Sequence, residues 1–327
     1  MTTSTHTPSL EDLEEHRREL IGYCYRMLGS GFEAEDAVQE TMVRAWRAAD
    51  SFEGRSSIRS WLYRIATNVC LDMLRSSQRR ARPMEIGPSR PPVESSLEAV
   101  LPEGAWVSPI ADDRVLPETD PAELAMVRES VRLAFVAALQ HLPPRQRASL
   151  ILCEVLHWQA SEAAELLDTS VAAVNSALQR ARATLASVDT GRKTETTDTV
   201  QAELLVRYVD AFEHYDIERL VKLLHEDAVQ SMPPYAMWLQ GSVDIGKFML
   251  GPGIGCRGSR LIPTSANGSP AFGHFKPHPD GVLRPWALQV IEFSGDRISG
   301  IHSFLNADEL FPVFGFPTEL PAAAERL

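Results

Sequence analysis

Proline divides this chain into parts that fold separately. Eight of its 22 prolines lie between residues 83 and 121. Because proline lacks a backbone N–H and clashes inside a helix, this segment forms neither a continuous helix nor a central strand. We therefore predict a proline-rich linker at 83–121 and a second, polar and Thr-rich linker at 189–199. Three compact units remain, which we place at 1–82, 122–188 and 200–327.

The composition is that of a globular protein, with 44% hydrophobic and 23% charged residues. No apolar run approaches the roughly 20 residues that cross a bilayer, and the polar, acidic N-terminus is unlike a secretory signal. We therefore expect a cytoplasmic protein that contacts no membrane. The four cysteines lie far apart without a CxxC pair, so they predict buried thiols, with neither a disulfide framework nor a metal site.

Charge is distributed in blocks. The formal net charge of −12 argues at first sight against a nucleic-acid partner, because Lys and Arg make most phosphate contacts. Residues 11–53 hold 11 acidic residues against five Arg, whereas residues 55–82 hold seven Arg and a single Asp. The acidic average therefore conceals a basic stripe.

The first two units have the apolar spacing of helices. Their hydrophobic residues recur every three or four positions, as in amphipathic helices. The predicted helices span residues 10–28, 34–46, 57–80, 124–142, 146–156, 160–167 and 171–185.

The third unit changes from helical to strand-like patterns. Two predicted helices, 201–215 and 217–224, are followed by alternating apolar segments separated by turn signals. The predicted strands span 228–232, 259–265, 271–274, 284–293 and 297–305. Helices followed by an antiparallel sheet indicate an α+β domain.

Residues 158–182 have the layout of a helix-turn-helix. Ala163 and Ala164 allow two helices to cross closely, while Val171, Val174 and Leu178 form the inner face of the second helix. From spacing alone, the simpler alternative of two packed helices without DNA contact stays open. The candidates for contact with base edges and phosphates are Ser170, Ala173, Asn175, Ser176, Gln179, Arg180 and Arg182.

Two longer motifs, in this order, carry a family resemblance. They are YCYRMLGSGFEAEDAVQETMVRAWRAADSFEGRSSIRSWLYRIATNVCLDMLR, from Tyr23 to Arg75, and LPPRQRASLILCEVLHWQASEAAELLDTSVAAVNSALQRARATL, from Leu142 to Leu185. The first resembles domain two, and the second domain four, of the extracytoplasmic-function (ECF) sigma factors of bacterial RNA polymerase. The resemblance implies a promoter-specificity subunit without catalytic residues or cofactors, in which domain two spans 1–82 and domain four 122–188.

Within domain two, the resemblance assigns the helix DAVQETMVRAW to core polymerase. The family docks this helix on the clamp helices of the β′ subunit, and domain four on the β flap. The implied polymerase-binding residues are Glu35, Asp36, Gln39, Glu40 and Arg44. A merely solvated acidic helix is the alternative.

The basic stripe follows that helix and corresponds to the family's promoter-melting segment. Cations interleaved with aromatic residues suit single-stranded DNA, and the family captures an extruded base of the −10 element there. Trp61 fits a core position better than a stacking platform. The candidates for −10 contact are Arg55, Ser56, Ser57, Arg59, Trp61, Arg64, Asn68 and Arg75.

The −35 recognition helix departs from the family pattern. Where the family often has Lys-Ser-Arg, this chain has Asn175, Ser176 and Ala177. Because two cationic contacts are missing, we expect weaker −35 binding with a smaller salt dependence. The usual glycine of the turn is replaced by Asp168.

The C-terminal unit resembles the SnoaL-like fold, a cone-shaped α+β barrel with a pocket. The resemblance rests on VRYVDAFEHYDIERLVKLLHEDAVQSMPP and GDRISGIHSFLN, and the linker text PEGAWVSPIADDRVLP resembles that of a sigma subfamily with this fused domain. In that subfamily the domain is taken to regulate the attached sigma factor. Whether it inhibits, activates or does both stays open.

A pocket in the C-terminal domain would accept an unidentified small ligand. We predict its lining as Tyr235, Trp238, Phe272, His274 and Trp286. Asp210, His214, His225, Asp227 and His274 are candidate acid–base groups, although surface or hydrogen-bonding roles fit them better.

The expected function is that of a sigma factor bound to core RNA polymerase and promoter DNA, regulated by its fused domain. The alternative is a ligand-responsive or isomerase-like SnoaL protein whose sigma part no longer recruits polymerase.

Overall fold

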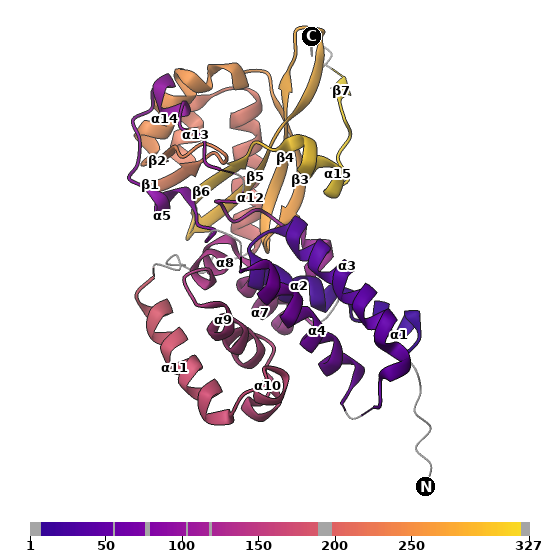
Figure 1. Ribbon diagram of the computed structural model, residues 1–327. Helices are drawn as coiled ribbons and strands as arrows, with labels where there is room; N and C mark the ends of the chain where they lie inside the picture. Colours follow the sequence, from indigo (N-terminus) through magenta and orange to yellow (C-terminus); the bar gives the residue numbers. More distant parts are fainter. Residues whose placement is uncertain are drawn as a thin grey trace. The chain divides into compact units, whose positions relative to one another are not determined.

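The computed structural model describes residues 8–54, 56–75, 79–102, 104–117, 120–188 and 198–321. Its contacts divide the chain into two compact units (Figure 1). Unit 1 comprises residues 1–81 and 107–190, and unit 2 comprises residues 82–106 and 191–327. The helical parts predicted at 1–82 and 122–188 thus share unit 1, while the predicted linker is divided between the two units.

Unit 1 is built from helices. Its elements are α1 (Leu10–Glu14), α2 (Arg17–Leu28), α3 (Gly31–Ala48), η1 (Ala49–Ser51), α4 (Ile58–Met73), α6 (Asp112–Val115), α7 (Pro121–Val131), α8 (Leu133–Leu139), α9 (Pro144–Leu150), the π-helical turn η3 (Ile151–Val155), α10 (Ala160–Leu166) and α11 (Val171–Ala186). The all-α class predicted for this part of the chain is confirmed.

Serine residues set where several of these helices begin. The hydroxyls of Ser30, Ser57 and Ser170 accept the backbone N–H three residues further on and so cap α3, α4 and α11. Gly29, at φ 73°, ends α2 in the left-handed conformation that glycine adopts without steric cost. Short polar caps therefore separate α2, α3 and α4, which pack on one another.

Several helix boundaries differ from those expected, and the helix predicted at 10–28 is divided into α1 and α2. The helix predicted at 57–80 ends at Met73, and the one predicted at 124–142 breaks at Arg132. Arg132 has ψ 143°, outside the helical range, and caps α8. The next helix begins earlier than expected because Pro144 occupies the first helical position, where a missing N–H is tolerated.

Unit 2 combines short helices with a curved sheet. Its elements are α5 (Pro83–Ile86), η2 (Glu94–Leu97), α12 (Asp198–Glu213), α13 (Ile217–Leu223), β1 (Leu224–Ser231), β2 (Trp238–Gln240), α14 (Ser242–Leu250), η4 (Pro252–Cys256), β3 (Arg260–Ala266), β4 (Ser269–Pro277), β5 (Val282–Ser294), β6 (Arg297–Phe304), α15 (Ala307–Val313) and β7 (Leu320–Pro321).

The strand order in the described part of unit 2 is β2-β1-β6-β5-β4-β3, with β7 added beside β5. Tight turns join the long strands: Asn267 and Gly268, both at positive φ, link β3 to β4, and Gly295 lies in the predicted turn between β5 and β6. β1 pairs with β6 in parallel, so the sheet is mixed and the expectation of a wholly antiparallel sheet was wrong. Parallel strands cannot be joined by a tight hairpin. After β1 and β2 the chain passes through α14 and η4 and re-enters the sheet at its other edge, as β3.

The main core of unit 2 lies between the sheet and the helices α12, α13 and α14, which cover one face of it (Figure 1). A smaller core forms where α15 places Phe311 against Phe275 and Leu283. The helices α14 and α15 were not predicted from the sequence. Within the described residues, no helix has both the length and the apolar character needed to cross a bilayer.

Candidate nucleic-acid and protein interfaces

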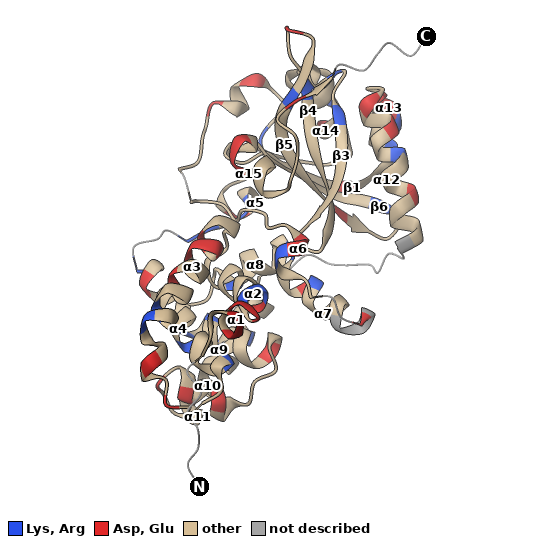
Figure 2. Ribbon diagram, turned by 90° about the vertical axis from the view of Figure 1, so that its right-hand side faces the viewer, with Lys and Arg blue, Asp and Glu red and all other residues tan. Residues whose placement is uncertain are grey.

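The predicted polymerase-binding residues lie on α3. Asp36, Gln39 and Arg44 are exposed, and Glu35 and Glu40 are half-buried. The Arg44 Nε lies 2.6 Å from a Glu40 oxygen. The acidic residues of α1 and α3 contrast with the arginines along α4 (Figure 2). The side chains gather on one polar surface, as expected for residues spaced by three or four along a helix.

Trp46, on the same helix, was missed by the sequence prediction. Its side chain is 66% exposed. It follows Gln39 by seven residues, which is two helical turns, so both face the same way. Exposed tryptophan beside polar residues is typical of the residues that contribute most to protein–protein binding. The spacing of seven residues between Gln39 and Trp46 could have shown from the sequence that Trp46 belongs to this surface.

The predicted −10 residues lie on and before α4, and several contact other parts of unit 1. Arg59 donates to a Glu19 oxygen at 2.8 Å and lies 5.2 Å above the rings of both Tyr63 and Trp158. Arg64 lies 3.6 Å from a Glu165 carboxylate oxygen on α10. Two of the predicted DNA cations are thus engaged by neighbouring residues.

The other predicted −10 residues have varied environments. Trp61 is half-buried with its ring 4.9 Å from that of Phe52, in keeping with a packing role. Asn68 is exposed, and Arg75 pairs with Asp72 at 3.2 Å. Ser56 is half-buried and Ser57 caps α4, while Arg55 lies outside the described residues.

The helix-turn-helix layout is present in α10, the turn at 167–170, and α11. Asp168 has φ 50°, so this aspartate adopts the left-handed conformation for which glycine is the usual residue. Val174 and Leu178 are buried as expected, whereas Val171 is 43% exposed. Val171 is the first residue of α11 and so lies beyond the point where α10 and α11 cross. All of the predicted −35 residues are exposed, namely Ser170, Ala173, Asn175, Ser176, Gln179, Arg180 and Arg182.

Two buried arginines connect the N-terminal helices of unit 1 to α7, α8 and α9. Arg147 donates to the Met27 carbonyl, to Gln140 Oε1 at 2.5 Å and to the Leu142 carbonyl at 3.1 Å. Arg26 donates to Ser130 Oγ at 2.6 Å. These arginines are 4% and 3% exposed.

Burial lowers the pKa of each of these guanidinium groups to about 10. Each therefore still carries its charge at neutral pH. The Arg147 charge is met by carbonyls at the C-terminal ends of α2 and α8, where the helix dipole is negative. Among the described residues, neither Arg26 nor Arg147 is paired with a carboxylate, so the contact is specific in geometry and costly in desolvation.

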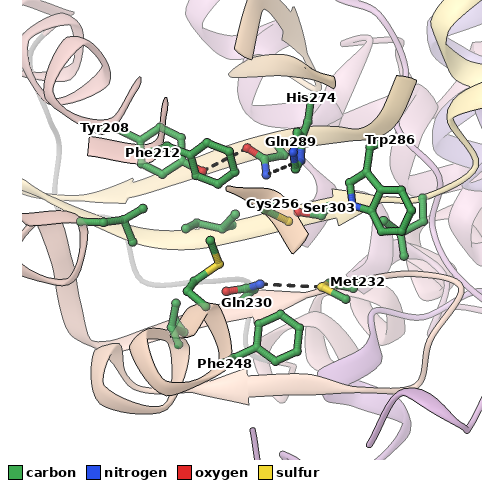
Figure 3. Close-up of a pocket in the computed structure, with 15 residues that line it drawn as sticks. Tyr208, Phe212, Gln230, Met232, Phe248, Cys256, His274, Trp286, Gln289 and Ser303 are labelled. Atoms are coloured by element: carbon green, nitrogen blue, oxygen red, sulfur yellow. Dashed lines mark hydrogen bonds between the residues drawn. The ribbon is translucent and has the colours of Figure 1, made fainter. Parts of the chain in front are cut away.

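Unit 2 contains a small cavity of about 40 Å³ (Figure 3). Of the five residues predicted to line it, His274 and Trp286 do so. Phe272 instead packs in the main core against Tyr208. The residues that line the cavity are Tyr208, Phe212, Leu220, Gln230, Met232, Ile245, Phe248, Met249, Cys256, His274, Trp286, Gln289, Ile301, Ser303 and Leu305.

Tyr235 and Trp238, also predicted as lining, contact residues 82–106 instead. The Trp238 indole N–H donates to the Gly87 carbonyl at 2.8 Å, and Tyr235 forms a β-bridge with Val100. Leu97 packs against the main core of the domain. This stretch of the predicted linker is therefore attached to the C-terminal domain, which only the tertiary structure reveals.

The remaining acid–base candidates lie away from the cavity. Asp210 forms surface ion pairs, at 3.2 Å with His214 and 2.8 Å with Arg219. Asp227 is exposed on β1, where its N–H donates to His225 Nδ1. Among the described residues that line the cavity there is no carboxylate, so a proton abstraction of the isomerase type lacks its usual base.

Comparisons with known proteins agree with this geometry. Residues 13–80 match the family model of sigma-70 region 2, and residues 132–185 match that of sigma-70, region 4. The chain is 46% identical over 313 residues to the ECF RNA polymerase sigma factor SigG of Mycobacterium tuberculosis, covering 94% of this chain and 83% of SigG.

A second relative links the sequence to a solved structure. SigJ of Mycobacterium tuberculosis is 28% identical over 248 residues, covering 74% of this chain and 72% of SigJ. The SigJ crystal structure superposes with a TM-score of 0.60 and 23% identity, covering 94% of this chain and 100% of that one. The shared fold thus includes the α+β domain. With both sigma regions in order and this identity to SigG, the chain belongs to the ECF RNA polymerase sigma factors.

Proposed function

We propose that the C-terminal domain regulates this sigma factor by holding residues 82–106 of the segment between the two sigma regions. An ECF sigma factor is a non-enzymatic initiation factor that directs RNA polymerase to promoters. In this protein the chain leaves unit 1 after Ala81 and returns at Val107. Whatever fixes the intervening residues also limits how far the two sigma regions can move apart.

The attachment of residues 82–106 to unit 2 carries the proposal. Backbone hydrogen bonds join Leu101 to the Pro234 carbonyl at 2.7 Å and Ala236 to the Ala99 carbonyl at 2.8 Å. Arg90 donates to the Trp238 carbonyl at 2.9 Å. With Leu97 packed on the core, these contacts hold both ends of the segment on the domain.

Within unit 1 we assign three surfaces to initiation. The α3 surface, extended by Trp46, docks on core polymerase, and the exposed face of α11 contacts the −35 element. Residues 56–75, around α4, contact the −10 element after the sigma regions separate, because Arg59 and Arg64 are engaged here by Trp158 and Glu165. In this form α11 exposes its proposed contact residues, although Arg182 pairs with Glu154. Arg59 and Arg64 of α4 are engaged by other parts of unit 1.

Run-off transcription with core polymerase and a cognate promoter tests the regulation. Leu97→Asp in the full chain places a charge in an apolar contact and releases the segment from the domain, so transcript yield changes several-fold. Val93→Asp, at an exposed position four residues earlier, is the matched control and leaves the yield unchanged. Equal yields from the wild type and both variants contradict the regulation.

The isomerase-like alternative gains no support. The cavity lining has no carboxylate among its described residues, and the sequence match covers both sigma regions. A pull-down of core polymerase by the full chain separates the two functions, because only a sigma factor is retained.

A further inference from the structure

Helix α11 packs on α9 and α10 through one side and exposes the other (Figure 1). Its buried residues are Val174, Ala177, Leu178 and Ala181. Because a helix turns by about 100° per residue, Ala172, Ser176 and Gln179 point in nearly the opposite direction, with Asn175 beside them. All four are exposed. The short side chains of Ala172 and Ser176 allow the backbone of α11 to come close to whatever lies against this side.

The first half of this helix carries no charged side chain. From Val171 to Gln179 the sequence is VAAVNSALQ, and the first cation is Arg180. Helix-turn-helix proteins contact base edges with the N-terminal residues of the second helix. Guanine is most often bound by a bidentate Arg or Lys, and cytosine by Asp or Glu. The part of α11 that is placed to meet bases therefore lacks the usual readers of a G·C pair.

Two side-chain amides supply hydrogen-bonding groups in this part of the helix. Asn175 and Gln179 are four residues apart, so they lie on one side of α11 and about 6 Å apart along its axis. Neither amide has a hydrogen-bonding partner among the described residues. In the major groove such an amide pairs with N6 and N7 of adenine. Because stacked base pairs are about 3.4 Å apart, the two amides reach adenines about two steps apart.

An apolar side chain begins the same side of the helix. Val171 is 43% exposed and precedes Asn175 by four residues, so the two side chains are neighbours. The C5-methyl of thymine is an apolar group that a base edge presents in the major groove. Val171 can therefore contact a thymine methyl next to the adenine that Asn175 binds.

We propose that α11 selects A·T pairs in the −35 element. Asn175 and Gln179 each bind N6 and N7 of an adenine, and Val171 packs against a thymine methyl. Arg180 lies about 100° further round the helix than Gln179, so it faces the phosphates and adds affinity without selectivity. The inference rests on the proposed contact of α11 with the −35 element and adds which bases the helix selects.

Selection from a DNA library tests the base preference. Core polymerase with the full-length protein binds duplexes whose −35 region is randomised within a cognate promoter, and the bound DNA is sequenced. We expect A·T pairs to be preferred about tenfold at two positions, which is the discrimination of one bidentate contact at each. Preference for G·C pairs at the most selective positions, or no selective position, overturns the inference.

A single substitution changes the expected preference. Asn175→Arg replaces an adenine reader by a guanine reader at an exposed helical position that tolerates Arg. We expect the preferred base to change from adenine to guanine at one position and to stay adenine at the other. Ser187→Arg, at the exposed C-terminal end of α11, is the matched control and leaves both preferences unchanged. An unchanged preference in Asn175→Arg, or the same change in both variants, shows that Asn175 does not read a base.

Modified bases identify the contacted atoms. Replacing a selected adenine by 7-deazaadenine removes N7 and lowers wild-type affinity about fivefold, and replacing the thymine by uracil removes the methyl and lowers it about fourfold. The first loss disappears in Asn175→Ala or Gln179→Ala, each at its own position, and the second in Val171→Ala. Unchanged wild-type affinity, or equal losses in the wild type and the variants, contradicts the assigned contacts.

Arg180→Gln separates failure of this inference from failure of the proposed function. If the variant keeps wild-type promoter affinity and no −35 position is selective, α11 does not contact the −35 element and both fail. If its affinity falls while the selected pairs are G·C, α11 contacts the element and only the base assignment is wrong.

Discussion

The two helices proposed to contact promoter DNA, α4 and α11, differ in how accessible they are. The predicted residues of α11 are exposed along one face, while its opposite face is buried in the helix-turn-helix. On α4, Arg59 and Arg64 are already occupied by an acidic side chain, an indole ring and α10. Arg182 of α11 also pairs with Glu154, but its side chain stays 62% exposed, whereas Arg59 of α4 is half-buried against two aromatic rings. If α4 contacts the −10 element as proposed, internal contacts of unit 1 must first be exchanged for contacts with DNA.

The engagement of α4 depends on the contact between the N-terminal helices of unit 1 and α7, α8 and α9, and the polar groups in that contact allow the two sets of helices to separate. Arg26 and Arg147 hold the α2 region to α7, α8 and α9 through hydroxyl, amide and carbonyl oxygens. Water can replace each of these partners when the helices part, and the guanidinium groups then regain full hydration. A purely apolar contact of the same size would lack that compensation.

The largest expected effect comes from Arg147→Met, which breaks the contact that keeps α4 engaged. The variant leaves the Met27 and Leu142 carbonyls without their donor and lowers the free energy of unfolding of unit 1 by about 3 kcal/mol. Chemical denaturation, followed by a helix-specific signal, measures this loss. Arg180→Met, on the exposed face of α11, is the control and leaves stability unchanged. An unchanged unfolding free energy for Arg147→Met would contradict the proposed role of Arg147 in joining the helices of unit 1.

The second effect concerns polymerase binding rather than folding. Trp46→Ala removes an exposed indole from the α3 surface, so affinity for core polymerase falls by about 2 kcal/mol. Binding to immobilised core enzyme measures it, with Val43→Ala on the same helix as a control of smaller surface. Retained affinity in Trp46→Ala contradicts the extension of the α3 surface to this residue.

A third effect tests the accessible helix. Arg180→Gln removes one proposed phosphate contact from α11, so holoenzyme affinity for promoter DNA falls by about 1 kcal/mol, and the salt slope decreases by about one unit. Filter binding at several salt concentrations measures both. Arg128→Gln, on α7, is the matched charge change, and an equal loss there shows that the effect is not local to α11.

The smallest effect sharpens the contrast between the two helices. Glu165→Gln removes the carboxylate that pairs with Arg64, and an exposed ion pair contributes only about 0.3 kcal/mol. Stability therefore hardly changes, while binding of single-stranded −10 DNA rises modestly, because Arg64 then keeps only its hydrogen bond to the residue 165 carbonyl, at 3.4 Å. Fluorescence anisotropy with a labelled oligonucleotide measures this change. Glu162→Gln on the same helix α10 is the control, and a decrease in binding for Glu165→Gln contradicts the proposed engagement of α4.

Local sequence patterns were a good guide where a residue's role follows from its own helix. The exposed face of α11 follows from the positions of Val174 and Leu178, because a helix with one buried stripe must expose the other side. Trp46 could have been found by the same reasoning from its spacing to Gln39. The parallel pairing of β1 with β6 could not, since it depends on a strand distant in sequence.

Side chains whose role depends on distant partners were placed less well. Tyr235 and Trp238 have the composition of pocket residues, yet they hold residues 87–100. Phe272 also suits a pocket, but strand register directs it into the main core. An aromatic side chain buries equally well against a cavity, a core or a neighbouring segment, so composition does not distinguish these roles.

The sequence by itself determined the family, the helix-turn-helix and the α+β class of the C-terminal domain. These depend on local periodicity and motif order. Only the tertiary structure decided that residues 82–106 attach to the C-terminal domain, that buried arginines join the helical regions, and that His274 lines a small cavity. The physical reason is that burial and hydrogen-bond partners come from segments far apart in the chain, and no local pattern records which of them meet.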